Sequence, residues 1–439
     1  MRILIALLAT WILAIVGVAA QTVEVEKRKD GEVRMSHSHN GVRLEVRYRG
    51  DVTVADDDLD ITQISSDGYL QISEDRRIGA DRRLELRSTF SGAPLSRRYF
   101  VDDRERAYDP EGKSWLAEVL PSVLRRSGLG AERRVGRILR TQGPSGVLNE
   151  ISLLESDYVR SLYFRLFLDQ ANPRGTLLAN ALAQAGRQID SDHELAKLLR
   201  RAAERAIGDS TTQNAYFDAA SSIGSDFELR QVLGAATHET LPATGVAHAL
   251  RTATSIGSDF ELASLLVDIG EKHMLNGTVR TAFFEALSSV ESDFEHRRVL
   301  ASLTKRVSDP ATLDAMLASA SRIESDFECA QFLIGIARPE VIEGTRNRFF
   351  ETAKTIGSDH EQRRVLTAVV ELPNLSSETL RALLRASTSI GSDYELASVL
   401  TRVAERHTLQ GSLRDAYLDA ASHIGSEHEK NRVLSLAIR

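Results

Sequence analysis

The stretch Ile-Gly-Ser-Asp-Phe-Glu occupies residues 223–228 and occurs again, unchanged, at residues 256–261. Successive copies of this motif begin 33–35 residues apart along the C-terminal two-thirds of the chain. A period in this range is typical of helical-repeat arrays, in which one repeat cannot bury its apolar face alone and neighbours must stack. Degenerate copies begin at Leu154, Ile189, Val290, Ile323, Ile356, Ile390 and Ile424. The sequence therefore predicts an α-solenoid over residues 154–439.

Each motif is interpreted as the start of a helix. In the copy at residues 225–228, Ser225 is the predicted N-cap and Glu228 is expected to return a hydrogen bond to it, as in a capping box. Asp226 lies in the first turn, where the helix dipole favours a negative charge. The predicted cap serines are Ser191, Ser225, Ser258, Ser292, Ser325, Ser358, Ser392 and Ser426. Their predicted glutamate partners are Glu194, Glu228, Glu261, Glu295, Glu328, Glu361, Glu395 and Glu429.

A second helix completes each repeat, for example over residues 278–289 or 412–423. The glycine of the motif, as in Gly224 or Gly257, is expected to end this helix in the left-handed conformation. A connection this short makes neighbouring helices antiparallel. Eight hairpins fit between residues 154 and 423, with one closing helix after them. The predicted fold is therefore α+β and multidomain, ending in a right-handed superhelix of about eight hairpins.

Residues 21–109 have a different, period-two pattern. Val42, Leu44, Val46 and Tyr48 alternate with charged residues, as in a strand with one solvated face. Turn signals such as Asn-Gly at 40–41 separate five such runs. We expect a small antiparallel β-domain here, either a sandwich or an irregular stack. Residues 110–153 return to a helical period and form a predicted joint or cap, with Pro121 expected to bend or break the first helix.

The N-terminus indicates export. Arg2 precedes an uncharged apolar run over residues 3–20, which ends in Val-Ala-Ala before Gln21. This pattern is typical of a secretory signal peptide, although a run of this length is also near the lower limit for a membrane anchor. Residues 21 onward are expected in the periplasm or outside the cell, with tethering to the inner membrane as the alternative.

Bulk composition narrows the function. The chain has 55 basic and 62 acidic residues, a net charge of −7, so a generic nucleic-acid binder is not indicated. Cys329 is the only cysteine, so no intrachain disulfide can form. It occupies a slot that is Leu229 or Leu262 in other repeats, and we expect a buried, inert thiol.

Several patterns resemble sites but have simpler interpretations. Repeated Asp/Glu pairs would form an acidic rim in the solenoid, but helix capping explains both residue types and their spacing. Asp56, Asp58 and Asp60 imitate a calcium loop, but the glycine and the final glutamate of such a loop are missing, so an acidic turn is favoured. His37 and His39 share a strand face without evident further ligands, so no metal site is predicted.

Two further patterns concern the repeats. His193, His360 and His428 occupy the slot that is Phe or Tyr in other copies, which we interpret as a packing position. Arginine pairs occur at 133–134, 297–298 and 363–364 and are interpreted as solvated helix faces. We find no phosphate loop, serine-hydrolase motif or zinc-protease motif. The sequence therefore predicts no catalytic, cofactor or metal site.

After the signal segment, the chain resembles the extracytoplasmic C-terminal region of bacterial BlaR1-type (M56) membrane metallopeptidases. The resemblance rests on residues 50–52 with 56–58, on residues 97–101, on residues 115–121 and on the helical repeats, which are also HEAT-like or TPR-like. The protease domain of that family, with its His-Glu-x-x-His motif, is absent here. The resemblance implies a stand-alone sensor-like or scaffold-like module, and it carries over no catalytic residue.

We therefore expect a non-enzymatic, exported binding scaffold that presents its solenoid to an envelope protein or peptide. A membrane-anchored structural or regulatory component is the first alternative. The second is an enzyme with its site at the joint between the β-domain and the helices, near Arg97, Asp102 and Trp115.

Overall fold

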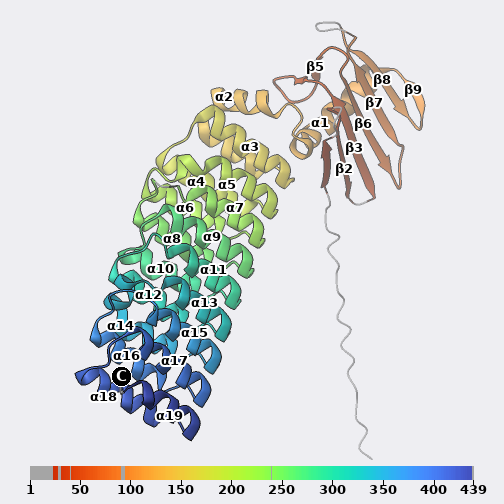
Figure 1. Ribbon diagram of the computed structural model, residues 1–439. Coiled ribbons are helices and arrows are strands. Elements are labelled where there is room, and N and C mark those ends of the chain that lie inside the picture. Colours follow the sequence, from red (N-terminus) through yellow and green to blue (C-terminus); the bar gives the residue numbers. More distant parts are fainter. Residues whose placement is uncertain (1–22, 28–30, 40, 90–93, 239, 438–439) are drawn as a thin grey trace, which may run out of the picture. The chain divides into compact units, whose positions relative to one another are not determined.

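The computed structural model describes residues 23–437, apart from 28–30, 40, 90–93 and 239, and these form two compact units (Figure 1). The first unit ends at Asn172 and the second begins at Pro173. The predicted order, an antiparallel β-domain followed by helical repeats, is confirmed. The predicted signal peptide, residues 1–20, lies outside the described residues. Within the described part, no helix is both long and apolar enough to cross a bilayer.

The first unit contains nine described strands. They are β1 (Val23–Lys27), β2 (Val33–His39), β3 (Val42–Arg49), β4 (Val52–Val54), β5 (Ile61–Ile64), β6 (Tyr69–Arg76), β7 (Arg82–Arg87), β8 (Ser96–Val101) and β9 (Arg104–Arg106). Seven of them pair in the antiparallel order β1-β2-β3-β6-β7-β8-β9, while β4 and β5 form a separate hairpin. The domain thus contains one open seven-stranded sheet and a separate two-stranded hairpin, which is neither a sandwich nor an irregular stack.

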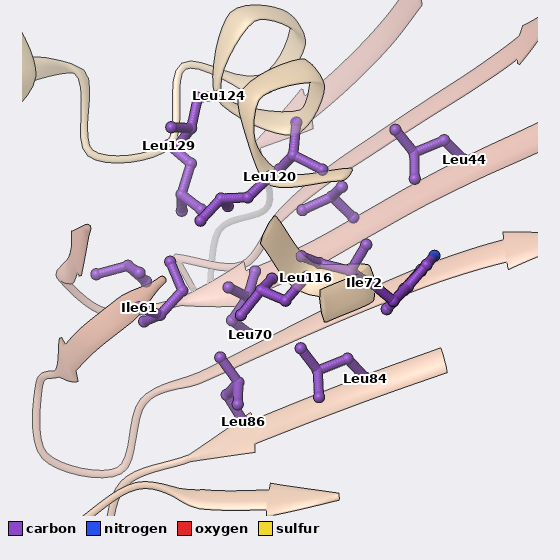
Figure 2. Close-up of a cluster of buried hydrophobic side chains, with 14 of the residues drawn as sticks. Leu44, Ile61, Leu70, Ile72, Leu84, Leu86, Leu116, Leu120, Leu124 and Leu129 are labelled. Carbon is purple, nitrogen blue, oxygen red and sulfur yellow. The ribbon is translucent and has the colours of Figure 1, made fainter. Parts of the chain in front are cut away.

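Alternation along the strands places the apolar residues of the sheet on one face. Val46 pairs with Ile72, Ile72 with Leu84, and Leu84 with Tyr99, so one apolar row crosses four strands. Helix α1 (Lys113–Ser127) packs on this row through residues that include Trp115 and lies over the sheet in Figure 2. Burial of this row and of the facing side of α1 removes a continuous apolar area from water and is the main stabilisation of the unit.

One expectation for the joint differs from the structure. Helix α1 continues through Pro121 without a non-helical residue, so this proline does not break the helix. The break lies in α2 (Ala131–Ser152) instead, where Gly143 adopts φ 70° and ψ −172° immediately before Pro144. Only glycine adopts this backbone conformation readily, which explains the residue at 143. A short π-helical turn, η1 (Tyr108–Gly112), connects the sheet to α1.

The second unit consists of sixteen described helices. They are α4 (Gly175–Gln188), α5 (Asp192–Ala206), α6 (Ser210–Ala220), α7 (Asp226–Ala236), α8 (Ala243–Ala253), α9 (Asp259–Lys272), α10 (Gly277–Leu287), α11 (Asp293–Leu303), α12 (Pro310–Ala320), α13 (Asp326–Ile336), α14 (Pro339–Ala353), α15 (Asp359–Val370), α16 (Ser377–Ser387), α17 (Asp393–Arg406), α18 (Gly411–Ser422) and α19 (Glu427–Leu436). Odd-numbered helices pack side by side in one layer and even-numbered helices in another, as Figure 1 shows.

The apolar residues of each repeat face the space between these two layers. In α7 the residues Leu229, Val232, Leu233 and Ala236 are all buried, which is the stripe that the sequence predicts. The sequence also placed the first solenoid helix after residue 154. In the structure that helix, α3 (Asp157–Ala171), belongs to the first unit.

Candidate functional site

The aspartate of each motif joins its own repeat to the next one. Asp293 at the start of α11 accepts hydrogen bonds from the backbone N–H groups of Glu324 (3.1 Å) and Ser325 (2.7 Å) at the start of α13. Equivalent bonds of 2.7–3.1 Å connect every odd-numbered helix from α5 to α17 with the following one. The other six acceptors are Asp192, Asp226, Asp259, Asp326, Asp359 and Asp393.

The cap serines contribute a weaker bond at the same junction. The side chain of Ser325 accepts from the N–H of Glu328 at 3.4 Å, and the other seven predicted cap serines do the same at 3.4–3.5 Å. These distances are longer than the usual 2.9–3.0 Å, whereas the aspartate bonds are short and involve a charged acceptor. The aspartate is therefore the stronger hydrogen-bonding member of the motif.

The glutamate of the motif forms an ion pair. Glu328 contacts Arg297 of the preceding odd-numbered helix, and Glu361 contacts Arg364 of its own helix at 2.6 Å. From α9 to α19 the two modes alternate. Glu261, Glu328 and Glu395 pair with the previous repeat, while Glu295, Glu361 and Glu429 pair within their own. Arg297 and Arg363 therefore tie neighbouring repeats together by ion pairs. Arg298 and Arg364 pair within their own helices, so neither arginine pair is simply solvated.

The glycines of the motif do not adopt the left-handed conformation, so this expectation was wrong. Gly224, Gly257, Gly357, Gly391 and Gly425 are absent from the described residues with positive φ. A Cβ at Gly224 would lie 3.6 Å from Asp192, an ordinary contact. Glu291 and Glu324 occupy the same slot in two other repeats. The turn therefore needs no glycine, and the aspartate of the preceding repeat satisfies its N–H groups.

The aromatic slot of the motif is exposed, which contradicts the predicted packing position. We call the eight residues of this slot the ring ladder: His193, Phe227, Phe260, Phe294, Phe327, His360, Tyr394 and His428. The four phenylalanines and the tyrosine have relative exposures of 52–61%, and the three histidines are also exposed. Ten large apolar side chains are exposed in the described part of the chain, and five of them belong to this slot. Exposed apolar residues that gather in one place mark interaction surfaces.

Helix geometry explains why these rings face solvent. Phe227 lies two residues before Leu229, the first buried residue of α7. Successive residues of an α-helix are rotated by about 100°, so the two side chains point to opposite sides. The same offset separates each ring of the ladder from the apolar stripe of its own helix. Because α5, α7 and the later odd-numbered helices stand side by side, the rings form one row along the unit.

Guanidinium groups lie over four of the rings. Arg230 and Arg297 stack on the rings of their own helices, at 6.0 Å from Phe227 and 5.4 Å from Phe294. Arg298 and Arg364 reach back to the previous odd-numbered helix, over Phe260 at 5.4 Å and Phe327 at 5.9 Å. Each ring of this central segment therefore has a cation over part of its surface and remains more than half exposed.

The solenoid unit carries the whole charge excess of the protein. Residues 1–172 have 26 basic and 26 acidic residues, and residues 173–439 have 29 basic and 36 acidic ones. Beside the ladder, Glu291 and Glu324 are exposed and form no ion pair among the described contacts. Two exposed carboxylates therefore accompany the row of exposed rings, three residues before Phe294 and Phe327.

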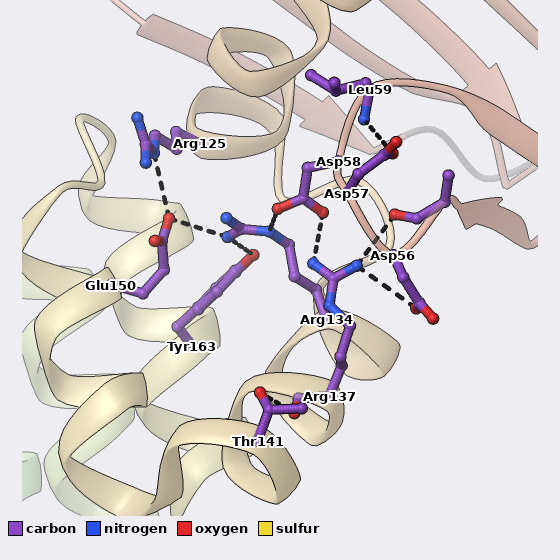
Figure 3. Close-up of polar contacts among 11 residues, drawn as sticks. Asp56, Asp57, Asp58, Leu59, Arg125, Arg134, Arg137, Thr141, Glu150 and Tyr163 are labelled. Atoms are coloured by element: carbon purple, nitrogen blue, oxygen red, sulfur yellow. Dashed lines mark hydrogen bonds and ion pairs between the residues drawn. The ribbon is translucent and has the colours of Figure 1, made fainter.

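A polar cluster in the first unit holds the helices against the β4–β5 loop (Figure 3). Arg134 is 7% exposed and donates to Asp58 (2.8 Å), Glu150 (2.9 Å) and Tyr163 (3.0 Å). Burial lowers the pKa of Arg134, but Tyr163 and Asp58 outweigh it, and the net shift is upward. Arg137 donates to the other oxygen of Asp58 at 2.6 Å. The solvated role that the sequence suggested for the arginine pair at 133–134 is therefore wrong for Arg134, while Arg133 is exposed.

These contacts also account for the loop that imitates a calcium site. Asp58 binds two arginines, and Asp60 accepts from Arg97 at 2.8 Å. No cluster of three or more acidic, histidine or cysteine ligands occurs among the described residues. A cleft of about 830 Å³ opens beside the loop, lined in part by Arg133, Arg137 and Asp56. Charges of both signs line it, so it favours no class of ligand.

The residues considered for an enzyme site at the joint have separate partners. Arg97 contacts Asp60 and Tyr108, Trp115 donates to Glu74 at 3.0 Å, and Asp102 accepts from the N–H of Asp81. No hydrogen bond among the described contacts links any two of Arg97, Trp115 and Asp102.

The two remaining sequence candidates are buried or partly undescribed. His37 is 2% exposed on the helix-covered face of β2, while the side chain of His39 lies outside the described part. Cys329 is 1% exposed, and burial raises the pKa of its thiol to about 11. A thiol with a raised pKa is mostly protonated and therefore a poor nucleophile.

Comparison of the whole chain with protein-family models and with curated proteins finds no match.

Proposed function

We propose that this protein is a non-enzymatic, exported scaffold that binds a protein or peptide of the cell envelope along its solenoid. The observation that carries the proposal is the ring ladder. Five large apolar side chains occupy one slot on the odd-numbered helices α7, α9, α11, α13 and α17, and all five are more than half exposed. Capping alone does not require a ring in this slot, since the aspartate and serine of the motif supply those hydrogen bonds.

A selection with a random peptide library tests the proposal. The purified wild-type protein is compared with a ladder variant that combines Phe227→Ser, Phe260→Ser, Phe294→Ser and Phe327→Ser. The control variant combines Ile78→Ser, Met274→Ser and Leu418→Ser, which remove other exposed apolar side chains. We expect peptides that bind the wild type and the control but not the ladder variant. Equal recovery of the library peptides on all three proteins would contradict the proposal.

Export is a second part of the proposal and rests on the apolar run over residues 3–20. Mass spectrometry of the protein from the envelope fraction determines its N-terminus. A mature end at Gln21 is the expected result. An intact Met1 in carbonate-resistant membranes would instead support the anchored alternative, and an intact Met1 in the cytoplasmic fraction would contradict export.

A further inference from the structure

We propose that the central ring ladder, from Phe227 to Phe327, binds a basic peptide segment in the polyproline II conformation, with one apolar residue at every third position. This inference rests on the proposed function and specifies the chemistry of its partner.

The first argument is the spacing of the rings. Four helices that pack side by side, α7, α9, α11 and α13, carry a ring at the same position: Phe227, Phe260, Phe294 and Phe327. Axes of packed helices are about 8–10 Å apart, so the rings recur at about this distance. A polyproline II helix has three residues per turn and rises about 9.3 Å per turn. Every third side chain of such a segment therefore meets one ring.

Other peptide conformations fit this period less well. Side chains on one face of a β-strand recur every two residues, at intervals of about 6.8 Å. The first two intervals end at about 6.8 Å and 13.6 Å, so these side chains lie on either side of the neighbouring ring. An α-helix presents one face every 5.4 Å, and two turns span about 10.8 Å, which exceeds the ring interval, so its side chains drift out of register with successive rings. Polyproline II segments are also pre-ordered and dock on surfaces that are lined by aromatic rings.

The second argument is charge. The solenoid has 36 acidic against 29 basic residues. Glu291 and Glu324 immediately precede the cap serines of α11 and α13, three residues before Phe294 and Phe327, and they form no ion pair among the described contacts. The aspartates and glutamates of the motif are already bonded within the array. Among the acidic residues of the four central motifs and their preceding turns, these two exposed glutamates are the carboxylates available to a partner, and basic side chains suit them.

The arginines over the rings indicate where the two kinds of partner residue bind. Arg297 and Arg298 already cover parts of Phe294 and Phe260, so a further cation over these rings is disfavoured. Apolar side chains of the partner therefore pack on the exposed parts of the rings, and its basic residues lie toward Glu291 and Glu324. The arginine cover leaves less of each ring face for an uncharged sugar to stack on, and the acidic excess of the unit disfavours an anionic glycan.

Fluorescence anisotropy with labelled peptides tests the inference. The first peptide is Leu-Pro-Arg repeated four times. The second has the same composition but leucines at irregular spacing, and the third replaces each arginine by glutamate. We expect the first peptide to bind the wild-type protein at least tenfold more tightly than either of the others. The ladder variant is expected to lose at least tenfold in affinity, and Glu291→Gln with Glu324→Gln about threefold to tenfold, with a smaller salt dependence.

Three outcomes would overturn the inference: equal binding of the irregular peptide, tighter binding of the acidic peptide, or displacement of the first peptide by a β-1,4-linked oligosaccharide. They are distinguishable from failure of the proposed function. Library peptides that need the ladder but lack the three-residue period would reject this inference and leave the scaffold standing. If no library peptide and no designed peptide depends on the ladder, both proposals fail.

Discussion

The carboxylate of Asp359 accepts a hydrogen bond from the backbone N–H of Ser392 at 2.8 Å, although the two residues lie 33 positions apart in the chain. A second bond, from the N–H of Gly391, is 2.9 Å long. The residue that starts α15 thus also satisfies the backbone donors in front of α17. Because the bond recurs at each junction from α5 to α19, local helix capping and contact between repeats depend on the same side chain.

Replacement of Asp359 by alanine is expected to lower the free energy of unfolding by about 1–3 kcal/mol, since it leaves two backbone donors without their acceptor. Urea denaturation followed by circular dichroism at 222 nm measures the effect. Asp415→Ala is the matched control, because Asp415 is exposed and forms no hydrogen bond or ion pair among the described contacts. Equal shifts of the two midpoints would show that the junction bond adds nothing to stability.

Glu343 is expected to make the stability of the protein depend on pH. Burial raises the pKa of this carboxyl, but hydrogen bonds from the backbone and side chain of Ser376 and from Arg346 outweigh it and hold the pKa at about 2. A carboxyl with a depressed pKa in the folded state stabilises the protein above its ordinary pKa of 4.5. This contribution is lost as the pH falls from about 4.5 toward 2.

The measurement for Glu343 is the difference in urea midpoint between the wild type and Glu343→Gln as a function of pH. It is expected to be constant from pH 7 to 5 and to shrink below pH 4.5. Glu285→Gln, at an exposed site without a described ion pair, is the control and should show no such trend. A difference that grows on acidification would contradict the assignment.

The buried Arg134 is expected to contribute to the stability of the first unit. Arg134→Met is expected to destabilise that unit by about 1–3 kcal/mol, because Asp58 and Glu150 lose a buried partner while each keeps another arginine. Trp115 is 3% exposed, and the other tryptophan, Trp11, lies in the proposed signal peptide, so the fluorescence of the protein that begins at Gln21 reports on this unit. Arg140→Met, on the exposed side of α2, should leave the transition in place.

The ring ladder should contribute little to folding. Phe294→Ser is expected to change the free energy of unfolding by less than about 1 kcal/mol, the scale of one exposed ring with a cation over it. Phe283→Ala, at a fully buried ring of α10, is expected to cost about 3–5 kcal/mol. Thermal denaturation separates the two cases. A loss at Phe294 as large as that at Phe283 would make the ladder a packing element, which is the role the sequence suggested.

The thiol of Cys329 is expected to be unreactive in the folded protein. The folded protein at pH 8 should not react with a thiol-specific dye such as Ellman's reagent, because the group is buried and its pKa is raised to about 11. One equivalent should react in 6 M guanidinium chloride. The variant Met274→Cys, at an exposed site, is the positive control for the folded state. Rapid reaction of the folded wild type would contradict the described burial.

Much of the solenoid could be predicted because its signals are local. The period of the motif fixes the repeat, and the spacing of Leu229, Val232 and Leu233 fixes the buried face. The exposure of Phe227 was also available from the sequence, since it lies about 200° from Leu229 around the helix. It was missed because a recurring ring was taken as packing without that check.

Other features required three-dimensional information. The bonds from Asp359 to Ser392 span a whole repeat, and the capping-box pattern offers a local partner that conceals them. The contact of Arg134 with Asp58 joins residues 76 positions apart. No periodic signal predicts it, because both residues lie outside the repeats. The single-layer sheet was equally hidden, since alternation along a strand does not say what covers its apolar face.

The alternation of glutamate pairing has a consequence for how this array can change in length. Removal of one repeat from the segment α11 to α18 would make neighbours of two odd-numbered helices whose glutamates pair in the same way, either both with the previous repeat or both within their own. One glutamate would then face no arginine, or one arginine would face no acid. Removal or duplication of two repeats preserves the alternation. The smallest evolutionary or engineering module of this solenoid is therefore a pair of hairpins, about 67 residues long.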